Sequence, residues 1–245
     1  MAPVTFWLMA ANVAVTLLTT LFVAEPDAFF WNWGLVPSQL GASLHGWVTV
    51  FTSMFLHGGW LHLAANMIML YFAGRLVETR IGPGRTATLY AVAGVLAGLA
   101  QVAWDPTSGV PMVGASGAIS GMFAAAVMLA PRERVLLITP LTLFIPIPMR
   151  LLTLGWLWLA LQVIGLMGAD PFGGGVAYMA HLGGYAGGLL FVWGLGWALA
   201  RRRESSRADY ARRLAIQHGP APSPRYRTVY VTDSMGRTFA FHEPR

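Results

Sequence analysis

Long apolar runs are the feature that most constrains what this chain can fold into. Several of them reach the roughly 20 residues that an α-helix needs to cross a bilayer. Of all residues, 56% are hydrophobic and 11% are charged, whereas a soluble domain carries about 25% charged residues. The sequence therefore predicts an all-α membrane protein with several spans.

Glycine, proline and charged residues interrupt the apolar runs and so predict where the spans lie. The N-terminal run lacks the basic start of a signal peptide, so it is interpreted as the first span. The six predicted helices cover residues 4–24, 57–77, 85–104, 115–130, 150–168 and 176–200. Residues 135–149 are also apolar but contain three prolines, which break helix geometry. A loop at the membrane surface is expected there.

The distribution of charge predicts how these helices are oriented. All sixteen basic residues are arginines. With six spans and a cytoplasmic N-terminus, every arginine falls on one side of the membrane. The loops on the other side hold acidic residues and no arginine (Glu25, Asp27, Asp105 and Asp170). The positive-inside rule is then obeyed at every loop, so both termini are predicted to be cytoplasmic.

Composition divides the chain into a membrane domain, residues 1–200, and a basic cytoplasmic tail, residues 201–245. Ten of the sixteen arginines lie in the tail. Such a tail is typical of a cytoplasmic end beside anionic lipid, and no nucleic-acid partner is expected. Residues 219–224, GPAPSP, indicate a flexible linker. Two runs of β-branched and aromatic residues within 227–241 predict a β-hairpin.

A few polar residues stand in the apolar helices, where polar groups are costly. His62 and Asn66 are four residues apart and share one face of the second helix. Ser116 opens the fourth helix, and His181 lies in the sixth. The predicted orientation places all four residues in the outer part of the membrane. The chain has no cysteine, which excludes disulfides, thiol catalysis and cysteine-ligated metals.

Each of these residues also has a structural interpretation when it is taken alone. Gly114 and Gly117, on either side of Ser116, fit close helix packing. A single intramembrane histidine fits a structural role or a proton path, and the His62–Asn66 pair fits an interhelical hydrogen bond or a metal site.

Two polar residues near the ends of the second helix are expected to have structural roles only. His57 is expected to cap the helix or hydrogen-bond a loop at the helix boundary. Glu78, between Arg75 and Arg80, is expected to form a surface ion pair.

Taken together, the polar residues predict nucleophilic catalysis. A serine needs a base within hydrogen-bond reach, and neutral imidazole is the usual choice. Ser116 and His181 are therefore predicted to form a dyad, because no carboxylate is placed to complete a triad. His62, Asn66 and the backbone N–H of Ser116 are candidate donors to an oxyanion. Glycines four residues apart on both helices would allow the close packing that the dyad needs (Gly117 and Gly121, Gly184 and Gly188).

At these residues the sequence resembles the rhomboid family of intramembrane serine proteases, over about residues 4–200. The matching stretches are HGGWLHLAANM, GASG and AHLGGYAGG, in this order. The resemblance implies a six-helix core that cleaves peptide bonds within or beside the membrane spans of other proteins, without a cofactor or a metal. It also assigns the site residues: Ser116 as nucleophile, His181 as general base, His62 and Asn66 as oxyanion-binding residues, and Gly114 as the glycine two before the nucleophile.

Two positions depart from patterns seen in some members of the family. The first outer loop has Trp47 without the arginine of a Trp-Arg pair, so the detailed fold of this loop can differ. Ser120, four residues after Ser116, stands where some members have tyrosine. A smaller or wetter floor of the site is expected.

The function predicted from these residues is that of a serine endopeptidase in a bacterial inner membrane, with transmembrane proteins as substrates and the bilayer as its environment. One alternative is a catalytically silent rhomboid-like protein that binds membrane clients. Another is a small transporter that moves protons through His181, but this requires a carboxylate deep in the bundle, and none is visible. The oligomeric state does not follow from the sequence.

Overall fold

The structure is a computed structural model, and it describes residues 2–137, 145–168, 175–196, 198, 226–233 and 235–244. Its contacts divide the chain into two compact units, Met1–Gly194 and Leu195–Arg245. The predicted linker and the arginine-rich part of the tail, residues 201–225, lie outside the described residues.

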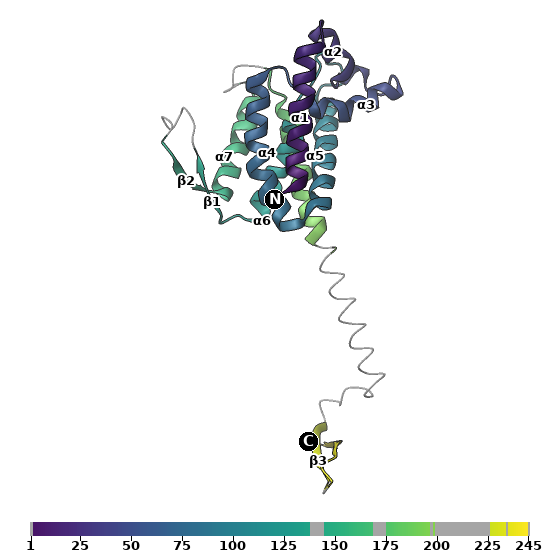
Figure 1. Ribbon diagram of the computed structural model, residues 1–245, viewed down its shortest axis with the longest axis vertical. Coiled ribbons are helices and arrows are strands. Elements are labelled where there is room, and N and C mark those ends of the chain that lie inside the picture. Colours follow the sequence, from purple (N-terminus) through teal and green to yellow (C-terminus); the bar gives the residue numbers. More distant parts are fainter. Residues whose placement is uncertain are drawn as a thin grey trace. The chain divides into compact units, whose positions relative to one another are not determined.

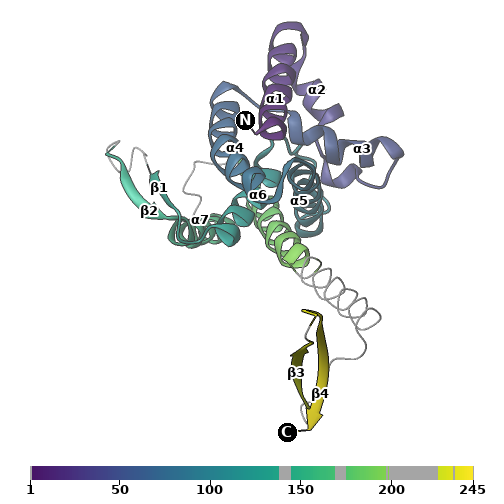
Figure 2. The same cartoon turned by 60° about the horizontal axis from the view of Figure 1, so that its bottom comes forward.

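The first unit is a helical bundle (Figure 1). A helix lies in each range predicted as a span, namely α1 (Pro3–Phe22), α4 (Trp60–Ile81), α5 (Pro83–Trp104), α6 (Ser116–Leu129), α7 (Leu151–Leu166) and a helix over residues 178–196. Among the described helices, α1, α4 and α5 are long and apolar enough to cross a membrane. Helix α6 lies in the middle of the bundle (Figure 2) and is buried along most of its length.

The boundaries of α4 differ from the predicted range 57–77. The helix begins at Trp60, after two glycines, and the charged residues near its end do not stop it. It ends at Gly82, which has a φ of +82° and so takes a conformation that favours glycine. Pro83 then starts α5, where its missing N–H costs nothing. The tight turn between α4 and α5 is therefore set by this Gly-Pro pair.

The expectation that Glu78 forms a surface ion pair is wrong. Glu78 is 5% exposed. Its carboxylate accepts hydrogen bonds from the backbone N–H of Val4 at 3.0 Å and from Thr5, both at the start of α1. The first N–H groups of a helix have no partner within it, and the positive end of the helix dipole favours an anion. Glu78 thus caps α1 from the end of α4.

Short helices connect α1 to α4, and they lie at one end of the bundle in Figure 1. They are α2 (Pro26–Trp33), η1 (Pro37–Gln39), α3 (Leu44–Thr52) and η2 (Ser53–Phe55). Trp31, Trp33 and Trp47 are exposed on them, as expected of an aromatic belt at a membrane interface.

The prediction of a loop over residues 135–149 is wrong at both ends of that range. Strands β1 (Arg134–Leu137) and β2 (Ile147–Arg150) form an antiparallel pair. Pro148 lies within β2 opposite Leu136. Proline is tolerated there because both strands of a two-stranded sheet are edge strands. Residues 138–144 lie outside the described residues.

In the second unit, β3 (Tyr226–Thr232) and β4 (Thr238–Pro244) form an antiparallel hairpin in the stretch where the sequence predicts one. Asp233 at the turn accepts hydrogen bonds from the backbone N–H groups of Met235 and Arg237, each at 2.9 Å. These hydrogen bonds lower the pKa of the Asp233 carboxyl.

Candidate active site

Ser116 is the first residue of α6, and the segment before it is held in place by other elements. Met112 exchanges two backbone hydrogen bonds with Leu35, and the N–H of Gly114 donates to the carbonyl of Ser53 at 2.9 Å. These contacts tie the segment to the connection between α1 and α4. They determine where the chain enters α6 and so where Ser116 is presented.

Gly114 has a φ of +128°, a conformation that L side chains rarely adopt. A Cβ added to Gly114 would lie 2.9 Å from His62 Nε2 and 3.7 Å from Ser116 Oγ. The space that Gly114 leaves is therefore bordered by both residues.

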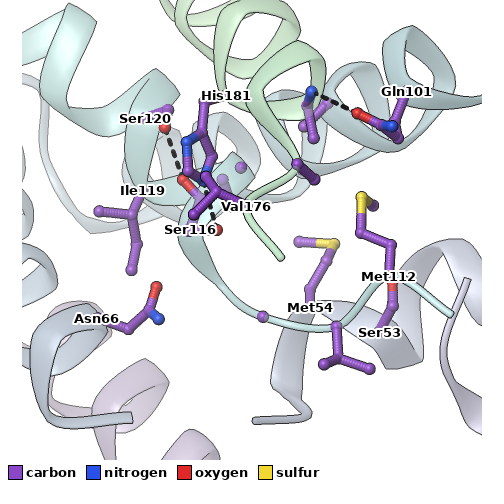
Figure 3. Close-up of a pocket in the computed structure, with 18 of the residues that line it drawn as sticks. Ser53, Met54, Asn66, Gln101, Met112, Ser116, Ile119, Ser120, Val176 and His181 are labelled. Carbon is purple, nitrogen blue, oxygen red and sulfur yellow. Dashed lines mark hydrogen bonds between the residues drawn. The ribbon is translucent and has the colours of Figure 1, made fainter. Parts of the chain in front are cut away.

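His181 lies on the helix over residues 178–196, and its Nε2 is 2.8 Å from Ser116 Oγ. Figure 3 shows the imidazole ring beside the serine, with the two side chains coming from different helices. The two residues are 65 positions apart in the sequence. The structure thus brings together the serine and the histidine that the sequence predicts as partners.

Close contact between the backbones of these two helices makes the short distance possible. A Cβ on Gly184 would overlap the carbonyl oxygen of Gly117, and one on Gly188 would overlap the carbonyl oxygen of Gly121. Small residues allow such an approach between membrane helices. The four predicted glycines are the residues at which the two helices touch.

His62 and Asn66 on α4 line the same cavity as Ser116 and His181, which has a volume of about 710 Å³. Asn66 faces it from the side of α4 (Figure 3). The Nδ2 of Asn66 donates to the carbonyl of His62 at 2.8 Å. An amide nitrogen carries two hydrogens, so one donor of Asn66 is left for another acceptor in the cavity.

His57 and Ser120 each contact a predicted site residue. His57 is buried, its Nδ1 is 3.4 Å from Thr16 Oγ1 on α1, and it also forms a hydrogen bond with the backbone of Phe55 in the connection before α4. Its ring packs edge-to-face on the ring of His62 at 5.1 Å. The hydroxyl of Ser120 donates to the carbonyl of Ser116 at 2.7 Å (Figure 3).

Three further side chains beside the dyad were not identified from the sequence. Gln162 on α7 contacts the second ring nitrogen of His181, and the ring of Trp158, one turn earlier, lies 5.9 Å from the His181 ring. Gln101 on α5 accepts a hydrogen bond from the N–H of Ala180 at 3.2 Å. The available signal was a glutamine within an apolar helix, but it does not reveal which residue the glutamine faces.

Among the described residues, no group of three or more histidine, aspartate or glutamate side chains is arranged to hold a metal ion. The cavity presents a hydroxyl, imidazoles, amides and the N–H groups at the start of α6. The positive end of the α6 dipole also favours negative charge at this position.

The chain matches a known protein family and is similar in sequence to several known proteins. Residues 44–198 match the Rhomboid domain family. Rhomboid-like protein 11, chloroplastic, from Arabidopsis thaliana is 33% identical over 123 residues, which cover 50% of this chain and 41% of that protein.

Two relatives named as proteases are also similar. Rhomboid protease GluP from Bacillus subtilis is 31% identical over 153 residues, covering 61% of this chain and 26% of that protein. Rhomboid protease GlpG from Klebsiella pneumoniae is 26% identical over 191 residues, covering 78% and 62%. The chain spans less than two thirds of the length of each of these three relatives.

Proposed function

Because the chain belongs to the rhomboid family, we propose that it is an intramembrane serine endopeptidase that hydrolyses peptide bonds in or near the transmembrane segments of other membrane proteins. The observation that carries the proposal is the 2.8 Å contact between Ser116 Oγ and His181 Nε2 at the wall of the cavity. That two relatives are named rhomboid proteases supports the proposal.

The proposed reaction begins when Ser116 Oγ attacks the carbonyl carbon of the scissile peptide bond. His181 Nε2 takes the hydroxyl proton as the new C–O bond forms, and it then gives that proton to the leaving amine. The product of this half-reaction is an ester between the substrate acyl group and Ser116. A water molecule, deprotonated by His181, hydrolyses the ester and regenerates the serine.

Charge on the substrate oxygen is stabilised by donors around the cavity. His62 and Asn66 provide them from α4, and the backbone N–H of Ser116 provides one from the first turn of α6, where helix N–H groups have no partner within the helix. Gly114 supports this arrangement by leaving space next to the serine, and Gly117 supports it by letting α6 pack closely against α5. The dyad needs no cofactor.

The proposed topology has six spans and two cytoplasmic termini in a bacterial inner membrane. The helix over residues 178–196 and the shorter apolar helices α6 and α7 complete the three long spans. The confinement of every arginine to one side supports this orientation. Residues 1–200 form the membrane domain, and residues 201–245 form a basic cytoplasmic tail whose arginines lie near anionic lipid.

The test is cleavage of a reporter protein with a single transmembrane segment by the purified protein in detergent and in liposomes. The wild-type protein should cleave the reporter and react with a fluorophosphonate probe. Ser116→Ala should do neither while remaining folded. Thr88→Ala is the matched control, because it removes an exposed hydroxyl that also donates to the carbonyl four residues earlier but lies on α5 outside the cavity lining, and it should keep the labelling. A folded wild-type protein that neither cleaves nor is labelled would favour the alternative of a silent, client-binding protein.

A further inference from the structure

The His181 imidazole is contacted at both of its nitrogens. Nε2 faces Ser116, and Nδ1 lies 2.8 Å from Oε1 of Gln162 on α7. We propose that Gln162 is a positioning residue for the general base: it selects the imidazole tautomer in which Nδ1 carries the hydrogen and Nε2 is free to accept the Ser116 proton. This inference rests on the proposed function and deepens it.

The orientation of the Gln162 amide follows from its second contact. Its Nε2 lies 3.4 Å from the backbone carbonyl of Trp158, one turn earlier on α7. A carbonyl oxygen only accepts hydrogen bonds, so the NH₂ group must face Trp158 and the amide oxygen must face His181. Because that oxygen also only accepts, Nδ1 of His181 must be the donor. The lone pair of the neutral ring is then on Nε2, toward the serine.

Gln162 is buried, and burial restricts the hydrogen bonds that its amide can form. Gln162 is 2% exposed, and a buried amide is costly unless its polar atoms are hydrogen-bonded. Both ends of the amide have partners here, one on the base and one on the helix backbone. If His181 carried its hydrogen on Nε2 instead, two acceptors would face each other at Nδ1 and Oε1. The environment therefore disfavours the tautomer that could not accept the serine proton.

A second residue on the same face of α7 restricts the ring. The Trp158 ring lies 5.9 Å from the His181 ring and stacks on Tyr185 with a centroid distance of 5.3 Å and an interplanar angle of 18°. Residues four apart on a helix share a face, so Trp158 and Gln162 approach the imidazole together.

A neutral amide differs from the carboxylate of a serine-protease triad. It accepts the Nδ1 hydrogen and orients the ring, but it carries no charge to stabilise the imidazolium that forms during the reaction. The expected contribution is that of one hydrogen bond between neutral groups, or roughly a tenfold effect on kcat.

The experiment compares Gln162→Leu, Gln162→Glu and wild type by kcat, KM and the pH dependence of kcat, and by ¹⁵N NMR of histidine-labelled protein. Signals of His181 are identified by their absence in His181→Ala. Gln101→Leu is the control, because Gln101 holds the helix next to His181 through the N–H of Ala180 and does not contact the ring. If Gln162→Leu acted only by loosening the packing of the helices, its tautomer population and its pH profile would match those of Gln101→Leu.

We expect Gln162→Leu to lower kcat about tenfold with little change in KM, and to lower the population of the Nδ1–H tautomer. Gln162→Glu should restore kcat to near the wild-type value and move the acid limb of the pH profile to higher pH, because a carboxylate favours the protonated ring. Gln101→Leu should leave the tautomer and the pH profile as in wild type.

The proposal is overturned if Gln162→Leu keeps the wild-type kcat and tautomer, or if Gln162→Glu loses as much activity as the leucine variant. If Gln162→Leu does not fold, an unchanged pH profile in Gln162→Glu overturns it. If the wild-type protein cleaves nothing, the proposed function fails, and the NMR comparison still decides whether Gln162 selects the tautomer.

Discussion

The carboxylate of Glu78 accepts two hydrogen bonds from Thr5, one from its backbone N–H and one from its hydroxyl, each at 2.8 Å. Thr5 lies in the first turn of α1, and Glu78 lies in the last turn of α4. The pair therefore joins the start of one helix to the end of another. Hydrogen bonds to charged groups contribute about 1.5–3 kcal/mol each, so this junction is expected to matter for stability.

We expect Glu78→Ala to lower the free energy of unfolding by about 3 kcal/mol, because it leaves buried donors of α1 without an acceptor. The measurement is unfolding in mixed micelles at increasing denaturing detergent, followed by circular dichroism. Glu133→Ala is the control: its carboxylate is half exposed in a salt bridge with Arg80, and such pairs contribute about 0–1 kcal/mol. Equal losses in the two variants would contradict the capping role of Glu78.

The residues around the cavity should differ in how much activity their loss removes. His181→Ala should be as inactive as Ser116→Ala, since the serine then has no base. Loss of one oxyanion donor costs about 10²–10³ in rate in a soluble protease, and here the donors are shared. Asn66→Ala should therefore retain measurable activity, with His62→Ala between the two extremes.

Initial cleavage rates of these variants, with thermal stability measured in parallel, check this order. If His181→Ala keeps activity while His62→Ala has none, the general base lies on α4.

Gly184 offers a test of the close helix contact. A Cβ there would overlap the backbone oxygen of Gly117, which cannot move as a side chain can. Gly184→Ala should push the two helices apart and lower the cleavage rate about hundredfold, the cost of an ångström-scale displacement of catalytic groups. Gly194→Ala, on the same helix with no atom within 4 Å of the new Cβ, should change stability by less than about 1 kcal/mol and keep the activity. Similar rates for both variants would show that the contact is not needed.

The proposed topology can be tested with fusions. A reporter enzyme that is active only in the periplasm should be inactive when it is fused after Arg245, and a reporter active only in the cytoplasm should be active there. This outcome follows from the arginines, which all lie on one side in the six-span arrangement. The opposite pair of results would exclude six spans with a cytoplasmic N-terminus.

Much of the helical framework and several candidate site residues could be predicted from the sequence, because the signals are local. Apolar runs indicate helices wherever they are long enough, although the predicted boundary at residue 77 missed the last turn of α4, which continues to Ile81. Ser116 and His181 could be predicted as candidate site residues because a polar group in an apolar helix is energetically costly and therefore indicates a function. The glycines at 117, 121, 184 and 188 indicated which faces could approach closely.

Other features depended on which helices pack together, and no local pattern contains that information. Glu78 has charged neighbours in the sequence and therefore looked like a surface residue, but the start of α1 packs against it and supplies three donors, two of them in buried hydrogen bonds. The strand pair at Arg134–Leu137 and Ile147–Arg150 forms only when two separate segments meet. The local sequence shows only the three prolines of residues 135–149, and these suggested a loop.

Gln162 is the clearest case of what only the tertiary structure decided. The sequence shows a glutamine in an apolar helix, and an amide there can hydrogen-bond any facing helix. The packing of α7 beside the helix over residues 178–196 puts its oxygen 2.8 Å from His181 Nδ1. The sequence by itself determined which polar groups stand in the apolar helices. The tertiary structure decided which of them meet, because a hydrogen bond across helices depends on distances of about 3 Å that only the packing of the bundle sets.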